Sequence, residues 1–321
     1  MIYSNRFCFG VDLGGTTTKM GIFTSEGQLI EKWEIPTDVS DGGSHILDDI
    51  ADSILEKARV NQLKENDIKG IGIGVPGPVR RMSIVDGCVN LGWGRVDVAG
   101  IMENKTQLWT CVANDANVAA LGELWQGNGR GCRNLMLVTI GTGIGCGIVI
   151  DGHIIEGSNG AAGELGHMTV LDEEDIIGTC GCGRRGCLEQ AASAYGIVRL
   201  TEKKLAQTQQ ESVLRGMDKI TAKDVFDAAK AGDQLAAGIT DKVMYYIGKA
   251  IANASVVLNP QTVILAGGVS LAGEYLRAGI EKYFNELCFK ACDTTQFRLA
   301  AMGADSGIYG AARMMIDMND E

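Results

Sequence analysis

One histidine and three cysteines form the group of side chains with the clearest chemistry in this 321-residue chain. After His167 and twelve further residues comes the segment CGCGRRGC, which contains Cys180, Cys182 and Cys187. One imidazole and three thiolates supply the four ligands of a closed tetrahedral Zn²⁺ site, although reduced thiols without a metal are the alternative. Because all four positions are filled, the pattern predicts a structural zinc and no zinc-bound nucleophilic water.

Two turns rich in glycine and threonine have the composition of phosphate-binding loops. The first is DLGGTTTK at residues 12–19, and the second is GTGIGCG at residues 141–147. Glycine lets backbone N–H groups turn toward an anion, and an aspartate at a strand end, such as Asp12, can hold a hydrated Mg²⁺. Each turn alone is equally explained by an ordinary β-turn or by close strand packing. The pair together predicts a clamp for a polyphosphate chain.

Several carboxylates have spacings that suit proton transfer or sugar binding. Asp115 follows Asn114 at a strand end before a helix, where it could be a general base or simply part of the helix cap. The glycine loop at residues 156–167 contains Glu164, and Glu189 comes two residues after the last cysteine of the cluster. Ionised carboxylates accept hydrogen bonds from sugar hydroxyls, whereas the alternative is solvated surface charge.

The elements that must position these groups follow from hydrophobic periodicity. Strands are expected at residues 7–12, 19–23, 28–36, 69–75, 110–113, 135–140, 146–150, 262–266 and 298–301. Helices are expected at residues 44–61, 117–125, 188–204, 221–231, 235–258, 271–287 and 306–315. A strand–turn–strand unit opens both halves, which suggests a weak internal duplication. We predict two α/β domains: residues 1–116, joined by the C-terminal helix at about 304–321, and residues 117–303 with the zinc loop.

Composition disfavours several classes of protein. Lys and Arg number 29 against 40 Asp and Glu, and the resulting net charge of −11 opposes binding to nucleic acid or to an anionic membrane. No signal peptide or membrane-spanning stretch is expected, since the start of the chain has no apolar core and the uncharged segment at residues 135–150 is shorter than the about 20 mostly apolar residues that a helical span needs. We therefore expect a cytoplasmic protein without a disulfide framework. The acidic run at residues 172–175 is expected to be a solvated loop.

Taken together, these motifs resemble those of the ROK family of sugar kinases, and within it the bacterial glucokinases, from Val11 to Ala312. The matching segments are DLGGTTTK at 12–19, GVPGPV at 74–79, NLGW at 90–93, NDANVAALGE at 114–123, TIGTGIGCG at 139–147, NGAAGELGHM at 159–168, CGCGRRGCLE at 180–189 and LAGGVS at 265–270. The cysteine cluster with its upstream histidine is highly specific to this family, whereas the glycine loops are shared with actin-like ATPases.

The resemblance implies an actin-like (ribonuclease H-like) α/β fold of two domains with a central cleft. It implies that Asp115 is the general base that takes a proton from the sugar 6-hydroxyl. It further implies sugar contacts by Gly77, Asn90, Asn114, Asp115, Glu164, His167 and Glu189. The implied nucleotide cradle, with Asp12 near Mg²⁺, is Asp12, Gly14, Gly15, Thr16, Thr17, Lys19, Gly141, Thr142, Gly143, Gly267 and Gly268. His167 would serve zinc through one ring nitrogen and a sugar hydroxyl through the other.

The implied activity is transfer of the ATP γ-phosphoryl group to the 6-hydroxyl of glucose, in glycolysis. N-acetylglucosamine, N-acetylmannosamine, mannose or fructose are alternative acceptors, and polyphosphate is an alternative donor. The family also contains sugar-responsive repressors, so a non-catalytic regulator is a further alternative, although the net charge opposes DNA binding. A homodimer or higher homo-oligomer is expected. Arg80-Arg81 and Cys146 depart from the family pattern and leave the sugar-side loop and the phosphate turn open.

Overall fold

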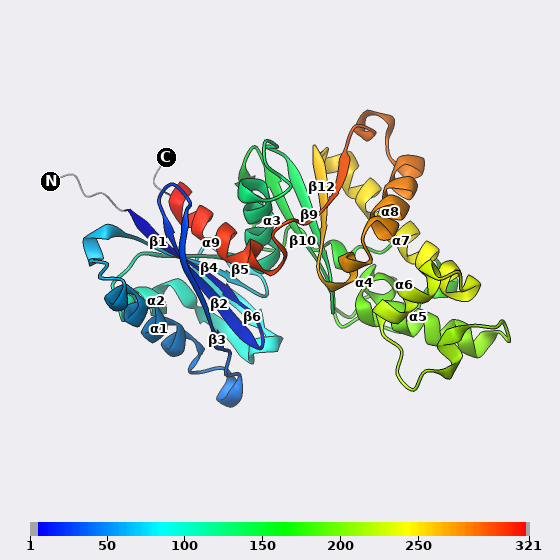
Figure 1. Ribbon diagram of the computed structural model, residues 1–321, viewed down its shortest axis with the longest axis horizontal. Coiled ribbons are helices and arrows are strands. Elements are labelled where there is room, and N and C mark those ends of the chain that lie inside the picture. The colour runs from blue at the N-terminus through cyan, green and yellow to red at the C-terminus, as the bar shows by residue number, and fades with distance from the viewer. Residues whose placement is uncertain (1–5, 319–321) are drawn as a thin grey trace. The chain divides into compact units, whose positions relative to one another are not determined.

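The computed structural model describes residues 6–318, which divide into two compact units (Figure 1). Of the described residues, unit 1 comprises 6–133, Gly147–Ala162 and 301–318, whereas unit 2 comprises Asn134–Cys146 and Gly163–Ala300. The last segment of the chain therefore belongs with the first. Among the described residues, no helix combines the length and the apolar character that crossing a membrane requires.

A five-stranded sheet with the order β3-β2-β1-β4-β8 is the centre of unit 1. Its strands are β1 Phe7–Leu13, β2 Thr17–Thr24, β3 Leu29–Pro36, β4 Ile68–Val75 and β8 Thr110–Asn114. The first three strands are antiparallel neighbours, and β4 and β8 run parallel to β1. Asp12 is in register with Gly74, and Asn114 with Val75, so the polar ends of β1 and β8 lie at the same edge.

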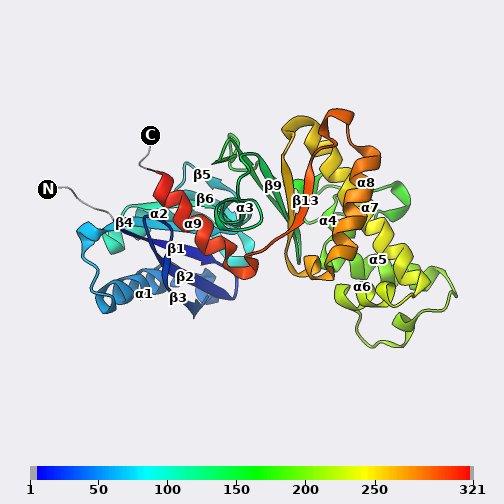
Figure 2. The ribbon, with the colours of Figure 1, turned by 45° about the horizontal axis from the view of Figure 1, so that its top comes forward.

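Helices cover both faces of this sheet (Figure 2). One face packs against α1 Ile46–Val60 and α2 Val98–Thr106, and the other against α3 Asp115–Gln126 and α9 Ser306–Asp317. A Cβ atom at Gly10 would lie 2.1 Å from the Ile308 carbonyl oxygen, and one at Gly72 would lie 1.9 Å from that of Ala311. Only glycine at these two positions lets α9 lie directly on the sheet.

The division of the chain differs from the predicted domain boundaries at two segments, of which the first contains α3. The prediction assigned residues 117–303 to the larger domain, whereas residues 117–133 and 147–162 belong to unit 1. The reason is packing, because α3 and α9 lie side by side: a Cβ atom at Gly310 would clash with the Val118 carbonyl oxygen at 1.6 Å. Unit 1 also contains a small antiparallel sheet of β5 Val79–Arg80, β6 Ile84–Cys88 and β7 Trp93–Asp97.

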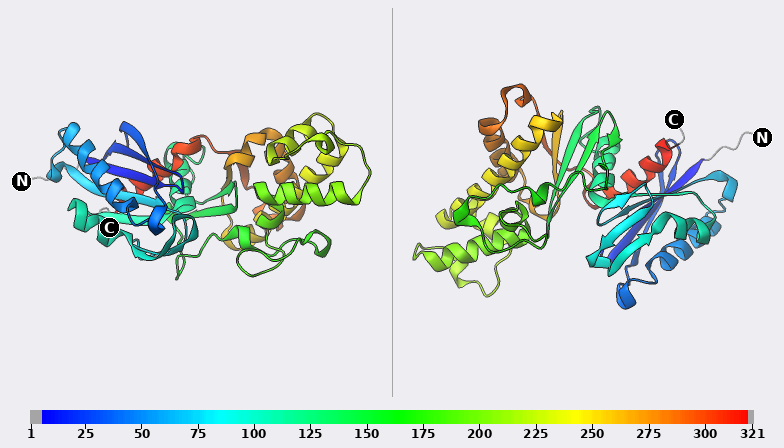
Figure 3. Two further views of the ribbon diagram at one scale, coloured as in Figure 1. Left: turned by 90° about the horizontal axis from the view of Figure 1, so that it is seen from below. Right: turned by 180° about the vertical axis from the view of Figure 1, so that it is seen from behind.

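The second five-stranded sheet has the order β11-β10-β9-β12-β13. Its strands are β9 Leu135–Ile140, β10 Ile144–Ile150, β11 His153–Ile154, β12 Thr262–Ala266 and β13 Gln296–Leu299. The helices of unit 2 are α4 Glu189–Ala192, α5 Ala194–Gln207, α6 Ala222–Lys230, α7 Gln234–Leu258 and α8 Glu274–Leu287 (Figure 3). Most of α7 is buried, so this helix is the centre of the helical part of unit 2.

Candidate functional site

The structure brings together the one histidine and three cysteines singled out from the sequence. The potential ligand atoms of His167, Cys180, Cys182 and Cys187 all lie within 4.8 Å of one another. A single antiparallel bridge between Thr169 and Cys187 holds the segment after His167 against the end of the cysteine loop. The four side chains therefore form one cluster, and all of them belong to unit 2.

The spacing of this cluster fits a tetrahedral zinc ion. With Zn–S near 2.3 Å and Zn–N near 2.1 Å, two sulfurs lie about 3.8 Å apart, and sulfur and nitrogen about 3.6 Å apart. The Sγ atoms of Cys182 and Cys187 are 3.6 Å apart, and Cys180 Sγ lies 3.7 Å from His167 Nδ1. Nδ1 is thus the ring nitrogen on the cysteine side, while Nε2 lies 3.9 Å from Glu164 Oε2.

The three thiols differ in how readily they lose a proton. The backbone N–H of Arg184 lowers the pKa of Cys182, whereas burial raises the pKa of Cys187 and raises that of Cys180 to about 12. Thiolates are the form that binds metal, so loading the site must release protons. Metal affinity is therefore expected to rise with pH.

Two carboxylates lie beside the imidazole of this cluster. Glu189 Oε1 is 3.6 Å from His167 Nδ1 and accepts a hydrogen bond from Cys180 Sγ at 3.1 Å. The side chain of Glu164 is half-exposed, and the backbone N–H of His167 donates to the Glu164 carbonyl at 3.1 Å. Two carboxylates and an imidazole edge can form several hydrogen bonds to a polyhydroxylated ligand.

The acidic run at residues 172–175 is exposed at three of its four positions, as the prediction of a solvated loop requires, but Asp175 is an exception. Asp175 is only 8% exposed, accepts a hydrogen bond from the Tyr246 hydroxyl, and pairs with Lys242 at 2.6 Å. The prediction was wrong for Asp175, because both of its partners come from α7, about seventy residues further along the chain.

In unit 1, the predicted base and its neighbours lie at the junction of β8 and α3. Asn114 caps α3, because its Oδ1 accepts from the backbone N–H groups of Ala116 at 2.9 Å and Asn117 at 3.3 Å. Its Nδ2 donates to the Gly77 carbonyl at 3.1 Å, which joins two of the predicted sugar-contacting residues. Asn114 is therefore the capping residue, while Asp115 is the first residue of the helix and its Oδ1 also accepts from the Ala116 N–H at 2.8 Å.

Asp12 and Asp115 influence each other electrostatically at this edge of the sheet. Burial raises the pKa of Asp12 to about 6, and the negative charge of Asp115 adds to the increase, whereas Lys19 opposes it. Lys19 Nζ itself donates to the Ala304 carbonyl at 3.3 Å. Two acidic groups that destabilise each other's charge form a site that a divalent cation would relieve.

The first glycine turn lies between β1 and β2, directly after Asp12. The Gly14 N–H donates to the Thr17 carbonyl at 3.2 Å, and both Gly15 and Thr16 are exposed at the tip. Asn90, in the short 3₁₀ turn Val89–Leu91, is exposed and lies next to Gly15, since a Cβ atom there would be 3.9 Å from the Asn90 Cβ. This turn, Asp12 and the predicted sugar contact Asn90 are thus neighbours.

The second glycine turn opens onto a cavity of about 480 Å³ within unit 2. Three of the five nucleotide-binding residues predicted there line this cavity, namely Gly141, Thr142 and Gly268, whereas Gly143 and Gly267 do not. Gly267 instead permits close packing, because a Cβ atom there would lie 2.5 Å from the Ile140 carbonyl oxygen. The cavity has the concave, mostly apolar character of a small-molecule site.

Sequence reasoning missed the residues of α6 that line the same cavity. The lining includes the buried aromatic ring of Phe226 and three charged side chains, Lys223, Asp227 and Lys230. Asp227 pairs with Lys223 at 2.5 Å and with Lys230 at 3.0 Å. No motif marks these residues, and the amphipathic pattern of α6 is the same as that of any surface helix.

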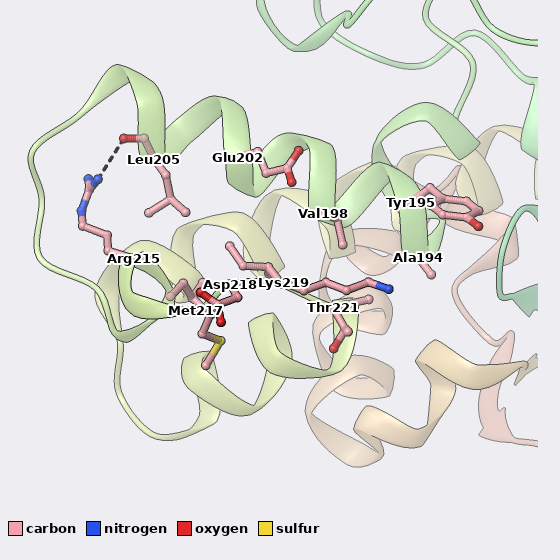
Figure 4. Close-up of a pocket in the computed structure, with 13 residues that line it drawn as sticks. Ala194, Tyr195, Val198, Glu202, Leu205, Arg215, Met217, Asp218, Lys219 and Thr221 are labelled. Carbon is pink, nitrogen blue, oxygen red and sulfur yellow. Dashed lines mark hydrogen bonds between the residues drawn. The ribbon is translucent and has the colours of Figure 1, made fainter.

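A second cavity, of about 600 Å³, shares Ala194, Thr221 and Ala222 with the first. It lies along one face of α5 and is lined by residues that no sequence motif indicated (Figure 4). Arg215 extends to the end of α5 and donates to the Leu205 carbonyl at 3.0 Å. Arg215 is therefore used in holding the loop, and the interior of this cavity is mainly apolar.

The two departures from the family pattern have local explanations. Arg80 forms an ion pair with Asp86 on the neighbouring strand β6, so its charge is balanced within the small sheet. Cys146 lies on β10, where it is buried, and burial raises the pKa of its thiol to about 12. At neutral pH, Cys146 is therefore a small uncharged core residue and does not change the charge of the phosphate turn.

Comparison with known proteins gives matches along the whole chain. The model of the ROK family matches residues 8–318. A glucokinase of Halalkalibacterium halodurans is 42% identical, over 96% of this chain and 94% of that protein, and a glucokinase of Thermotoga maritima is 35% identical, over 95% and 96%. A ROK family glucokinase of Streptomyces griseus, solved with glucose and AMPPNP, superposes with a TM-score of 0.76 and 30% identity, over 96% and 98%. The predicted actin-like α/β fold is thereby confirmed.

Proposed function

Since this chain belongs to the ROK family, we propose that it is an ATP-dependent glucokinase, which transfers the γ-phosphoryl group of ATP to the 6-hydroxyl of glucose. The observation that carries the proposal is the 42% identity to a glucokinase over nearly the full length of both proteins. The chemistry of the residues agrees with it, because a candidate base, a polyol-binding group and two glycine-rich turns are all present.

In the proposed reaction, Asp115 accepts the proton of the sugar 6-hydroxyl as that oxygen attacks the phosphoryl group. General-base assistance of this kind contributes about 10²–10⁴-fold to the rate. The remaining catalysis in phosphoryl transfer comes from positioning and from stabilisation of charge. Asp12 would hold the hydrated Mg²⁺ that accompanies ATP, and this ion supplies charge neutralisation at the phosphates.

The proposed donor contacts are the glycine-rich turns. In unit 1 the proposal uses Asp12, Lys19 and the exposed tip of the β1–β2 turn, which comprises Gly14, Gly15, Thr16 and Thr17. In unit 2 the cavity beside Gly141, Thr142 and Gly268 has the volume and the apolar lining to take the adenosine part. Gly143 and Gly267 would support the backbone of these turns.

The sugar would be held by hydrogen bonds from the residues that the family resemblance implied. The proposed contacts are Gly77, Asn90, Asn114 and Asp115 in unit 1, and Glu164, His167 and Glu189 in unit 2. His167, Cys180, Cys182 and Cys187 would hold Zn²⁺, which supplies a rigid crosslink of the loop. His167 would then face the sugar with Nε2, since Nδ1 lies on the cysteine side.

The test is a coupled assay of ADP release with glucose, N-acetylglucosamine, N-acetylmannosamine, mannose and fructose as separate acceptors. We expect the largest kcat/KM with glucose. Turnover that is faster with another hexose would move the assignment to that sugar, and no turnover with any of them would refute the kinase. Replacing ATP by polyphosphate in the same assay identifies the donor.

The proposal also includes the cellular location and the oligomeric state of the enzyme. Reduced thiols and an ATP donor both fit the cytoplasm, where disulfides are rare. A homodimer or larger homo-oligomer also stays a prediction, and sedimentation velocity on the purified protein measures it. A mass of 34.1 kDa would indicate a monomer and contradict this prediction.

A further inference from the structure

The segment between His167 and Cys180 is attached to the rest of unit 2 along most of its length. We call residues 170–177 the strap, because they connect the first metal-binding residue to the other three. The Val170 N–H donates to the Gly186 carbonyl at 3.0 Å, next to Cys187. The strap therefore begins in direct contact with the cysteine loop, and it ends three residues before Cys180.

One face of α7 binds the strap through three side chains. Lys242, Tyr246 and Lys249 are spaced by four and three residues, so they lie on the same side of the helix. Lys249 donates to the Val170 carbonyl at 2.9 Å and pairs with Asp172 at 3.3 Å. Lys242 pairs with Asp175 at 2.6 Å.

Tyr246 lies at the centre of this contact and has no exposed surface. Its hydroxyl donates to the carboxylate of Asp175 and accepts from the backbone N–H of Asp172 at 3.3 Å. Asp175 is 8% exposed, so water cannot replace the hydroxyl without opening the strap. Burial, followed by the Asp175 hydrogen bond, raises the pKa of Tyr246, so its hydroxyl keeps its proton at neutral pH.

Helix α5 holds the far end of the strap through backbone contacts. Arg199 donates to the Ile177 carbonyl, and Lys203 donates to the Glu174 carbonyl. Five side chains from two helices thus hold one eight-residue segment. Such dense support exceeds what a surface loop needs, but it is what a rigid support for binding residues requires.

We propose that Tyr246 is a positioning residue for sugar binding, which fixes the strap so that His167 and Glu164 keep the geometry that a hexose needs. This inference rests on the proposed function. The Tyr246 hydroxyl holds Asp172 and Asp175, and these two residues fix the position of the strap. The strap begins at Val170, which is three residues from His167. Tyr246 makes no contact with the reacting groups in this scheme.

The test is Tyr246→Phe in the full-length, zinc-loaded enzyme, which removes one oxygen and keeps the ring. We expect the KM for glucose to rise by about ten-fold, because a buried hydrogen bond to a charged group is lost. The KM for ATP, the zinc content by mass spectrometry and kcat at saturating glucose are expected to stay within about two-fold, since the hydrogen bonds of the Tyr246 hydroxyl go to Asp172 and Asp175 and not to the metal-binding or nucleotide-binding side chains. Asp175→Asn is expected to produce the same pattern.

Tyr245→Phe is the matched control, because it removes the same atom from the adjacent residue. Within the described residues, the Tyr245 hydroxyl has no hydrogen bond, and its ring packs against Tyr283. An unchanged glucose KM in Tyr246→Phe, with only a lower melting temperature, would overturn the proposal. Loss of zinc from Tyr246→Phe would also overturn it, since the effect would then pass through the metal. Inactivity of the wild-type protein would instead refute the glucokinase assignment.

Discussion

Replacing Asp12 by asparagine should stabilise unit 1 at neutral and alkaline pH, although the same change should impair catalysis. Asp12 lies at the end of β1, where burial and the nearby charge of Asp115 oppose its ionisation. The folded protein must therefore hold a carboxylate in an unfavourable place, whereas asparagine has nearly the same shape and no charge. Strain of this kind is common at catalytic sites.

The size of the effect follows from the pKa of Asp12, which is about 6 in the folded protein against an ordinary value of 3.8. A difference of about two units corresponds to about 3 kcal/mol. An acid with a raised folded pKa stabilises the fold fully below pH 4, and this contribution is lost as the pH rises through 6. The variant should thus equal wild type near pH 4 and exceed it by about 3 kcal/mol at pH 8.

Urea unfolding followed by tryptophan fluorescence measures this difference in the correct unit. All four tryptophans, at positions 33, 93, 109 and 125, belong to unit 1. The titrations should contain EDTA, because Mg²⁺ bound near Asp12 would favour its ionised form. Glu34→Gln on the exposed side of β3 is the control, since it removes one carboxylate from an exposed position.

The result that refutes this reasoning is a stability difference that does not depend on pH, or one that is larger at pH 4 than at pH 8. The first outcome would show that Asp12 has an ordinary pKa in the folded chain, and the second would show that its pKa is lowered, so either would remove the electrostatic cost of its position. An equal gain in Glu34→Gln would show that the effect reflects only the net charge of −11.

Three further predictions address the rest of the site. Asp115→Asn should lower kcat by about 10²–10⁴-fold with little change in the glucose KM, and near-normal steady-state kcat would show that Asp115 is not the base. Cys182→Ser should lose the zinc measured by mass spectrometry and raise the glucose KM; retention of a wild-type KM without zinc would contradict the role of the metal as a support for the loop. Glu123→Ala should destabilise unit 1 by about 3 kcal/mol in the same urea titration, because the buried carboxylate accepts from the backbone N–H groups of Asn128, Ala301 and Met302. A change below about 1 kcal/mol would argue against this support.

The sequence was most informative where a local pattern determines the geometry. The run ending at Asp12 predicts a strand because its residues are apolar and buried on both faces, and the helix after Asn114 follows from its capping side chain. The cysteine cluster could be predicted because its ligands are close in sequence. By contrast, β5 has two residues and β6 contains both charged and apolar residues, so neither shows a periodic pattern.

The parts that could not be predicted depend on contacts between distant residues. Nothing near Asp175 in the sequence indicates that its carboxylate accepts a hydrogen bond from Tyr246 and is buried. The sequence of α6 is that of an ordinary amphipathic helix, and only the fold places its cavity-lining residues beside the glycine turn between β9 and β10. The assignment of α3 depends on glycines at its contact with α9, a helix that is synthesised almost two hundred residues later.

The position of α9 determines the order in which the units can be completed during synthesis. Strands β1 and β4 emerge first, but the helix that covers one of their faces comes from the last residues of the chain. Until then Cys8, Phe23 and Cys111 lack that cover, whereas every residue of unit 2 has already been made. Unit 1 is therefore incomplete until α9 has been made, and a chain that ends near residue 300 leaves this apolar face of the sheet without that helix and open to chaperones and proteases.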